Sequence, residues 1–78
     1  MINRFYIRLN GKVVASYPQA KSAFLKAMEL RDDFKLSDCV LEVSDSDRRF
    51  YDFHCRACRR AFVEDTQITV SSHYSQLL

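Results

Sequence analysis

Hydrophobic and polar residues alternate along the first part of the chain. Phe5, Ile7 and Leu9 are separated by polar or basic neighbours, which is the two-residue period of a strand with one buried face. Asn10 and Gly11 follow, and this pair favours the left-handed dihedral angles of a two-residue hairpin turn. The pattern predicts a hairpin with an inward face of Phe5, Ile7, Leu9 and Val14. The expected outward face carries Arg4, Tyr6, Arg8, Val13, Ala15 and Tyr17.

A three- to four-residue spacing replaces this alternation after Pro18. Apolar residues then recur on one side of a helix, and the polar residues fall away from that side. The residues of this stripe are Ala20, Ala23, Phe24, Ala27, Met28 and Leu30. The spacing predicts an amphipathic helix of about three turns, packed on the sheet.

Two further alternating segments predict strands over 39–43 and 49–55, with a turn at the Ser- and Asp-rich residues 44–47 between them. The expected inward residues are Cys39, Leu41, Val43, Tyr51, Phe53 and Cys55. Residues 67–70 predict a last short strand. The segment 56–64 fits a helix and a strand equally well, and both assignments remain open.

This order of elements predicts an α+β fold, in which a small antiparallel sheet of β-β-α-β-β-β order has one amphipathic helix packed on one face. A length of 78 residues suits one domain spanning residues 1–78. A hydrophobic content of 47% lies above the range of disordered chains.

The three cysteines leave at least one thiol without a partner in the chain. The N-terminal residues have no apolar run of signal-peptide length, and no window approaches a membrane span. We therefore expect a cytoplasmic protein with reduced thiols and no membrane association.

The cysteines raise the hypothesis of a zinc-stabilised small domain. His54, Cys55 and Cys58 lie close in sequence, with Cys39 and His73 elsewhere. A structural zinc site needs four convergent ligands, usually from two pairs, and only one C-x₂-C pair is present. We expect no metal and no other cofactor, and zinc remains the second alternative.

Catalysis has little support in the sequence. A nucleophilic cysteine needs a base, and His54 points away from Cys55 if both lie on one strand. No paired carboxylates or phosphate-binding loop are recognisable. We therefore expect a protein that is not an enzyme.

Charge is distributed in blocks, although the net charge is only +2. Residues 1–27 carry five bases and no acids, residues 28–47 carry seven acids against two bases, and residues 48–60 carry five arginines against Asp52. The basic and aromatic residues of the hairpin resemble a surface that neutralises phosphates and stacks bases. A small RNA- or DNA-binding module is therefore the first alternative.

Protein binding accounts for the same residues. Tyr and Arg are enriched at interface hot spots, because they combine a large contact area with directional hydrogen bonds. The expected contacts are Arg4, Tyr6, Arg8 and Tyr17, with a second patch of Arg56, Arg59 and Arg60. The chain is then either a monomer or a homodimer that docks on a protein partner.

The hairpin and the segment 14–26, which is followed by paired strands, resemble the small anti-CRISPR proteins of phage. The matching positions are Ala15, Ser16, Gln19, Ala20, Lys21 and Lys26. The resemblance implies a non-enzymatic, phage-type inhibitor that docks on a larger host nucleoprotein complex. Our leading hypothesis is therefore a small protein-binding module of this kind.

Overall fold

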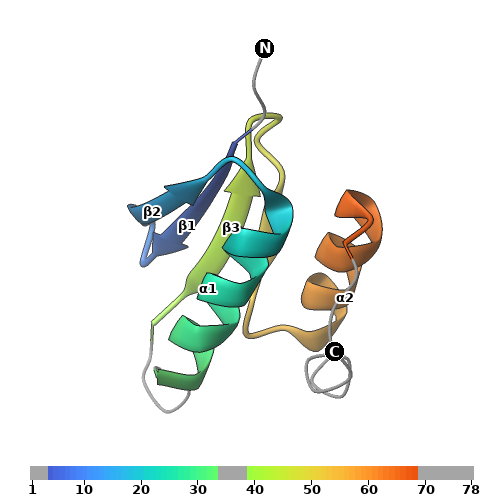
Figure 1. Cartoon of the computed structure of the whole chain (residues 1–78). Coiled ribbons are helices and arrows are strands. Elements are labelled where there is room, and N and C mark those ends of the chain that lie inside the picture. The colour runs from blue at the N-terminus through green and yellow to red at the C-terminus, as the bar shows by residue number, and fades with distance from the viewer. Residues whose placement is uncertain (1–3, 34–38, 69–78) are drawn as a thin grey trace.

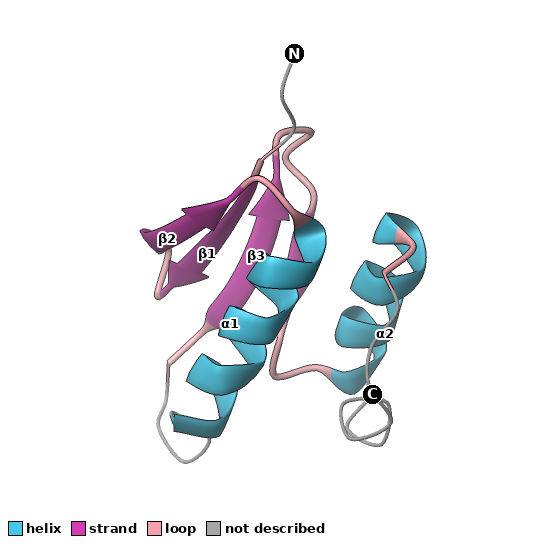
Figure 2. Cartoon of the chain, viewed as in Figure 1, coloured by secondary structure: helices cyan, strands magenta, loops and turns pink. Residues whose placement is uncertain are grey.

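The computed structural model of the protein describes residues 4–33 and 39–68, and these residues form four antiparallel strands and two helices. The elements are β1 (Phe5–Leu9), β2 (Lys12–Tyr17), α1 (Ala20–Asp33), β3 (Leu41–Asp45), β4 (Phe50–Asp52) and α2 (Arg56–Thr66). The strands form one sheet in the order β2-β1-β3-β4. Both helices lie on the same side of this sheet (Figures 1 and 2). This architecture confirms the predicted α+β class, and it contains a second helix.

The Asn10-Gly11 turn connects β1 and β2 as expected. Both residues have positive φ angles, 53° at Asn10 and 82° at Gly11, which a tight hairpin turn requires. Asn10 also donates its N–H to the carbonyl of Val40 at 2.8 Å, and its side-chain oxygen accepts the Val40 N–H at 2.9 Å. The turn is therefore attached to the chain just before β3.

The predicted facing of β2 is wrong beyond Val13, because a β-bulge interrupts the hairpin. Arg8 pairs with Val13, but Ile7 pairs with Ala15, so that Val14 is an extra residue in β2. An extra residue reverses the facing of everything that follows it. Tyr17 consequently lies opposite Phe5 and packs against the core.

Helix α1 covers the sheet with the predicted stripe. Ala23, Phe24, Ala27 and Met28 are completely buried, and Ala20 and Leu30 pack against the same core. The helix begins after Gln19, whose carbonyl accepts the N–H of Ala23.

The predicted strand over 49–55 is shorter in the structure. Asp52 ends β4, because its carboxylate accepts the N–H of His54 at 2.9 Å and its carbonyl accepts the N–H of Cys55 at 3.1 Å. Phe53 still donates its N–H to the carbonyl of Leu41, and beyond it the turn replaces sheet pairing. Tyr51 and Phe53 face the core as expected, but Cys55 starts a helix and is not an inward strand residue.

Helix α2 resolves the ambiguous segment 56–64. It ends at Thr66, and the following C-cap residue, Gln67, has a left-handed conformation with φ 54°. Gln67 and Ile68 therefore belong to no strand, contrary to the predicted strand over 67–70, and residues 69 and 70 lie outside the described residues.

Phe62 joins α2 to the rest of the core. Its buried ring lies 5.1 to 6.4 Å, between ring centroids, from four other aromatic rings contributed by β1, α1, β4 and the following turn. These rings belong to Phe5, Phe24, Tyr51 and Phe53. The Phe24 ring is stacked on Phe62, and the other three rings meet it edge to face. Aromatic pairs in these arrangements stabilise a core beyond the area that they bury.

Candidate binding surface

The side of the sheet opposite the helices is exposed in the described part of the chain. Strand pairing aligns its outward residues in two rows that run across the strands. One row contains Ser16, Tyr6, Ser44 and Phe50, and the other contains Val13, Arg8, Glu42 and Asp52. We call these eight residues, together with Arg4, the open face.

Arg8 is held near the centre of the open face by contacts on three sides. Its Nε donates to the hydroxyl of Ser44 at 3.3 Å, and its Nη1 donates to the carbonyl of Gly11 at 3.1 Å. Its guanidinium carbon also lies 5.4 Å from the centroid of the Phe50 ring, a cation–π contact. The side chain is therefore ordered and remains half-exposed.

Phe50 is the large apolar group of the open face, with 53% of its surface exposed. It stands next to Ser44, which is buried beneath its neighbours. On the other side of Ser44 lies Tyr6, which is half-exposed. Two aromatic rings and an arginine therefore surround a small buried serine.

Polar groups of both signs surround this centre. Arg4 donates from Nη2 to the hydroxyl of Ser16 at 3.0 Å. Glu42 and Asp52 follow Arg8 in the same row of the sheet. The open face thus combines arginine, carboxylate and aromatic groups and is not uniformly basic.

The structure separates the predicted contact residues. Arg4, Tyr6 and Arg8 share the open face, but Tyr17 lies on the opposite side of the sheet, because the bulge at Val14 reverses its facing. Arg56 and Arg60 are exposed on α2, in the helical layer behind the sheet.

Arg59 is not a surface contact as predicted. It is only 4% exposed, and its guanidinium donates to the carbonyl of Phe53. Burial, followed by the charges of Arg31 and Arg56, lowers the pKa of Arg59. Its role in the structure is to support the turn between β4 and α2.

The alternation over 49–55 puts Phe50 on the side opposite the inward residues Tyr51 and Phe53, but Phe50 is not among the contact residues expected from the sequence. Alternation alone gives no reason to choose it, because single exposed apolar residues are common on protein surfaces. The sequence does not show that Phe50 lies two strands away from Arg8 in the sheet.

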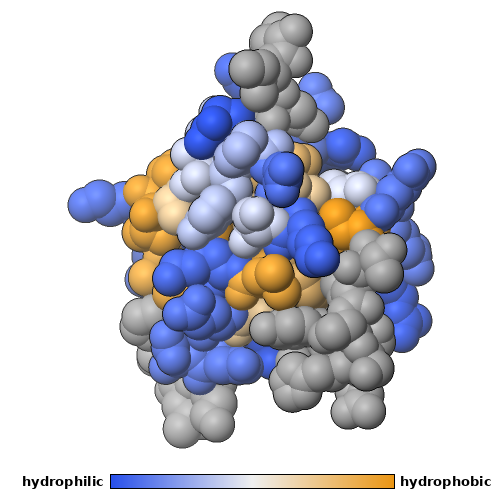
Figure 3. Space-filling view, viewed as in Figure 1, coloured by the Kyte–Doolittle hydropathy of each residue, from blue (hydrophilic) through white to orange (hydrophobic). Residues whose placement is uncertain are grey.

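The free edge of β2 is less suited to adding a strand from a partner. Figure 3 shows hydrophobic colour gathered over this edge, where Val13 and Val14 are 45% and 51% exposed. However, the bulge at Val14 breaks the regular pairing pattern, and bulges protect edge strands from further pairing. The open face is therefore the better candidate for docking.

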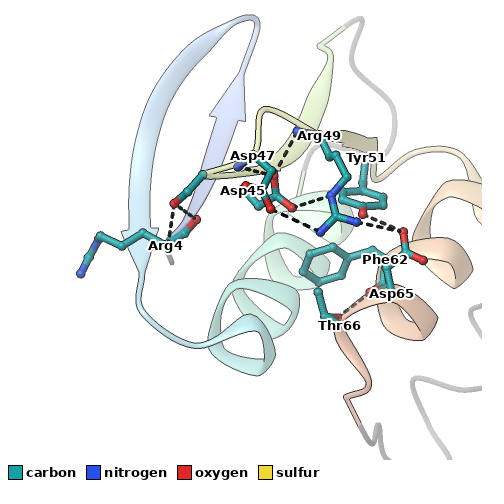
Figure 4. A network of polar contacts seen from close by, with 9 residues as sticks. Arg4, Asp45, Asp47, Arg49, Tyr51, Phe62, Asp65 and Thr66 are labelled. Atoms are coloured by element: carbon teal, nitrogen blue, oxygen red, sulfur yellow. Dashed lines mark hydrogen bonds and ion pairs between the residues drawn. The ribbon is translucent and has the colours of Figure 1, made fainter. Parts of the chain in front are cut away.

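A polar network fixes β4 in place (Figure 4). Asp45 is buried, and its carboxylate accepts the N–H groups of Asp47 and Arg49 at 3.0 Å and Nε of Arg49 at 2.9 Å. The hydroxyl of Tyr51 donates to Asp65 of α2 at 2.8 Å. Burial and this bond raise the pKa of Tyr51 to about 12. The network holds the strand that carries Phe50 between the turn and α2.

Cys39, Cys55 and Cys58 form no disulfide among the described residues, and all three are half-buried. Within residues 4–33 and 39–68, no three His, Cys, Asp or Glu side chains are grouped closely enough to hold a metal ion. His73, which the zinc hypothesis invoked, lies outside the described residues. In the same ranges neither helix has the length and apolarity to cross a membrane.

Comparisons with known proteins assign no function to the open face. No protein-family profile matches the chain, and no curated protein or solved structure is significantly similar to it.

Proposed function

We propose that the protein is a small non-enzymatic binding module that docks on a protein partner through the open face. The observation that carries this proposal is the arrangement of Arg8 over Phe50, beside Tyr6. Arg and Tyr dominate interface hot spots, and ordered side chains lose less conformational entropy on binding. Contacts already formed in the free protein therefore favour a tight interface.

The charge pattern supports a protein partner over a nucleic acid. Glu42 and Asp52 lie in the same row as Arg8, where they would repel a phosphate backbone. The donors of Arg8 are also directed at Ser44 and Gly11 within the protein. A protein surface can match both signs of charge and also cover the exposed ring of Phe50.

The resemblance to phage anti-CRISPR proteins supplies a narrower form of the proposal. In that form the partner is a subunit of a larger nucleoprotein complex of the host, and docking blocks a nucleic-acid-binding surface of that complex. Cys39, Cys55 and Cys58 form no disulfide within the described residues, which supports a reducing, cytoplasmic site of action.

The experiment is a pull-down from lysate of the native host, with the tagged protein and two variants as baits. The double variant Tyr6→Ala/Arg8→Ala should lose the partner that the unaltered protein retains, while circular dichroism shows a preserved fold. Lys21→Ala, an exposed change on α1, is the control and should retain the partner. Equal recovery by the double variant would reject the open face as the docking surface.

Two further outcomes would replace the protein partner by another class. Binding to a nucleic acid with a steep fall in affinity as salt increases would indicate a nucleic-acid module. A concentration-dependent homodimer that the double variant abolishes would make a second copy of the chain the occupant of the open face.

A further inference from the structure

Cys55 and Cys58 occupy the first turn of α2. Cys55 is the residue at the helix N-cap, with an extended backbone at φ −88° and ψ 120°, and Cys58 is the third helical residue. Residues at these two positions face each other across the first turn, as in a capping box. Both side chains are half-buried and neither forms a disulfide. The C-x₂-C pair is therefore a pair of neighbouring thiols at the start of an eleven-residue helix.

The surroundings distinguish the two thiols. The backbone N–H of Cys58 forms no full capping hydrogen bond with the Cys55 side chain. The partial positive charge of this N–H is nevertheless the main cause of the lowered pKa of Cys55. The Cys58 thiol and the N–H of Ala57 act in the same direction, whereas burial and Asp52 oppose them. The hydrogen bond to Cys55 and burial raise the pKa of Cys58. Thiolates at helix N-termini in C-x-x-C pairs are the reactive form of cysteine.

The charged groups around the pair are of both signs. Asp52 at the end of β4 disfavours a thiolate at Cys55, and Arg59, itself near Arg31 of α1, interacts favourably with it. Cys39 provides an internal comparison, because it is also a half-buried cysteine without a disulfide but lies outside any helix.

We propose that Cys55 and Cys58 form a reactive dithiol that exchanges with low-molecular-weight disulfides, with Cys55 as the attacking thiol and Cys58 as the resolving thiol. The Cys55 thiolate attacks one sulfur of the small disulfide, forms a mixed disulfide and releases the first small thiol. Cys58 then loses its proton and attacks the Cys55 sulfur. The second small thiol leaves, and a disulfide between Cys55 and Cys58 remains. The protein is oxidised by two electrons, and the small disulfide is reduced to two thiols.

This activity is separate from docking, because the pair lies at the start of α2 and the open face is formed by the strands. The probe is glutathione disulfide, mixed at neutral pH with the reduced full-length protein and followed by intact mass and peptide mapping. The unaltered protein and a Cys39→Ser control should both lose two hydrogens and form the disulfide between Cys55 and Cys58. Cys58→Ser should instead accumulate one glutathione on Cys55, because the resolving thiol is missing.

Alkylation of the unaltered protein provides a second measurement that needs no variant to fold. At neutral pH iodoacetamide should label Cys55 about threefold or more faster than Cys39. The proposal is overturned if glutathione is distributed equally over all three cysteines, if the disulfide formed includes Cys39, or if Cys55 is alkylated no faster than Cys39.

Discussion

The guanidinium of Arg8 in β1 lies 5.4 Å from the ring centroid of Phe50 in β4, although β3 separates the two strands. The arginine reaches across Ser44 of β3, to which it also donates a hydrogen bond. A small residue at the central position is what allows this contact. Three strands therefore cooperate to build the centre of the open face.

Phe62 should be the residue that contributes most to the packing of α2 against the rest of the core. Phe62→Ala should lower the free energy of unfolding by about 3–5 kcal/mol, because the cavity would remove contacts to four other rings. Leu25→Ala, on the exposed side of α1 with 37% exposure, is the control and should cost much less. Urea denaturation measures both, and equal losses would contradict the described core.

Asp45, at the end of β3, and Asp47, in the turn that follows, should differ in their contribution to stability. Asp45→Ala removes a buried acceptor of three hydrogen bonds and should cost about 2–3 kcal/mol. Asp47→Ala should change stability by about 0.5 kcal/mol or less, since its side chain is 75% exposed and lies 4.0 Å from Arg49. Thermal unfolding of the two variants would contradict this assignment if Asp47→Ala were the more damaging change.

Arg59 and Arg60 are neighbours in the sequence, but their replacement by alanine should affect stability to different extents. Arg59→Ala should destabilise the protein by about 1–3 kcal/mol, because it removes a buried donor to the carbonyl of Phe53. Arg60→Ala alters an exposed side chain and should have little effect on stability. Chemical denaturation that finds equal stabilities for the two variants would show that Arg59 does not support the turn.

Tyr51 should give the protein a specific sensitivity to alkali. Its pKa is about 12 in the folded state and 10.0 as a free side chain, so the folded state binds the phenolic proton more tightly. The stabilisation is fully present below pH 10 and is lost as the pH rises from about 10 to about 12. Ultraviolet titration of the tyrosines should show a late-titrating group that is missing in Tyr51→Phe. A loss of amplitude in Tyr51→Phe that falls near pH 10, with the late-titrating phase retained, would argue against the bond to Asp65.

How far the sequence predicts the structure depends on whether the determining contacts are local. The facing of β1 and the stripe of α1 follow from simple periodicity, and the structure confirms both. The bulge at Val14 has no local signal in the sequence, because Val14 is itself a good strand residue. The predicted facing of Tyr17 is wrong for this reason. The end of β4 at Asp52 did have a signal, since aspartate side chains readily form turns.

The candidate surface was predictable only in part for the same reason. Outward residues of one strand, such as Tyr6 and Arg8, can be identified from alternation alone. Phe50 joins them through strand order, which the sequence does not encode locally. Arg59 was misassigned because an arginine is rarely buried unless a specific acceptor is available, and that acceptor is a backbone carbonyl.

The most direct test of docking through the open face is the affinity of the purified partner for Phe50→Ala and for Lys21→Ala, measured by calorimetry. We expect Phe50→Ala to weaken binding by about thirtyfold, which corresponds to a hot-spot loss of about 2 kcal/mol. Lys21→Ala should bind as the unaltered protein does. An unchanged affinity for Phe50→Ala, with its fold preserved, would contradict the central claim.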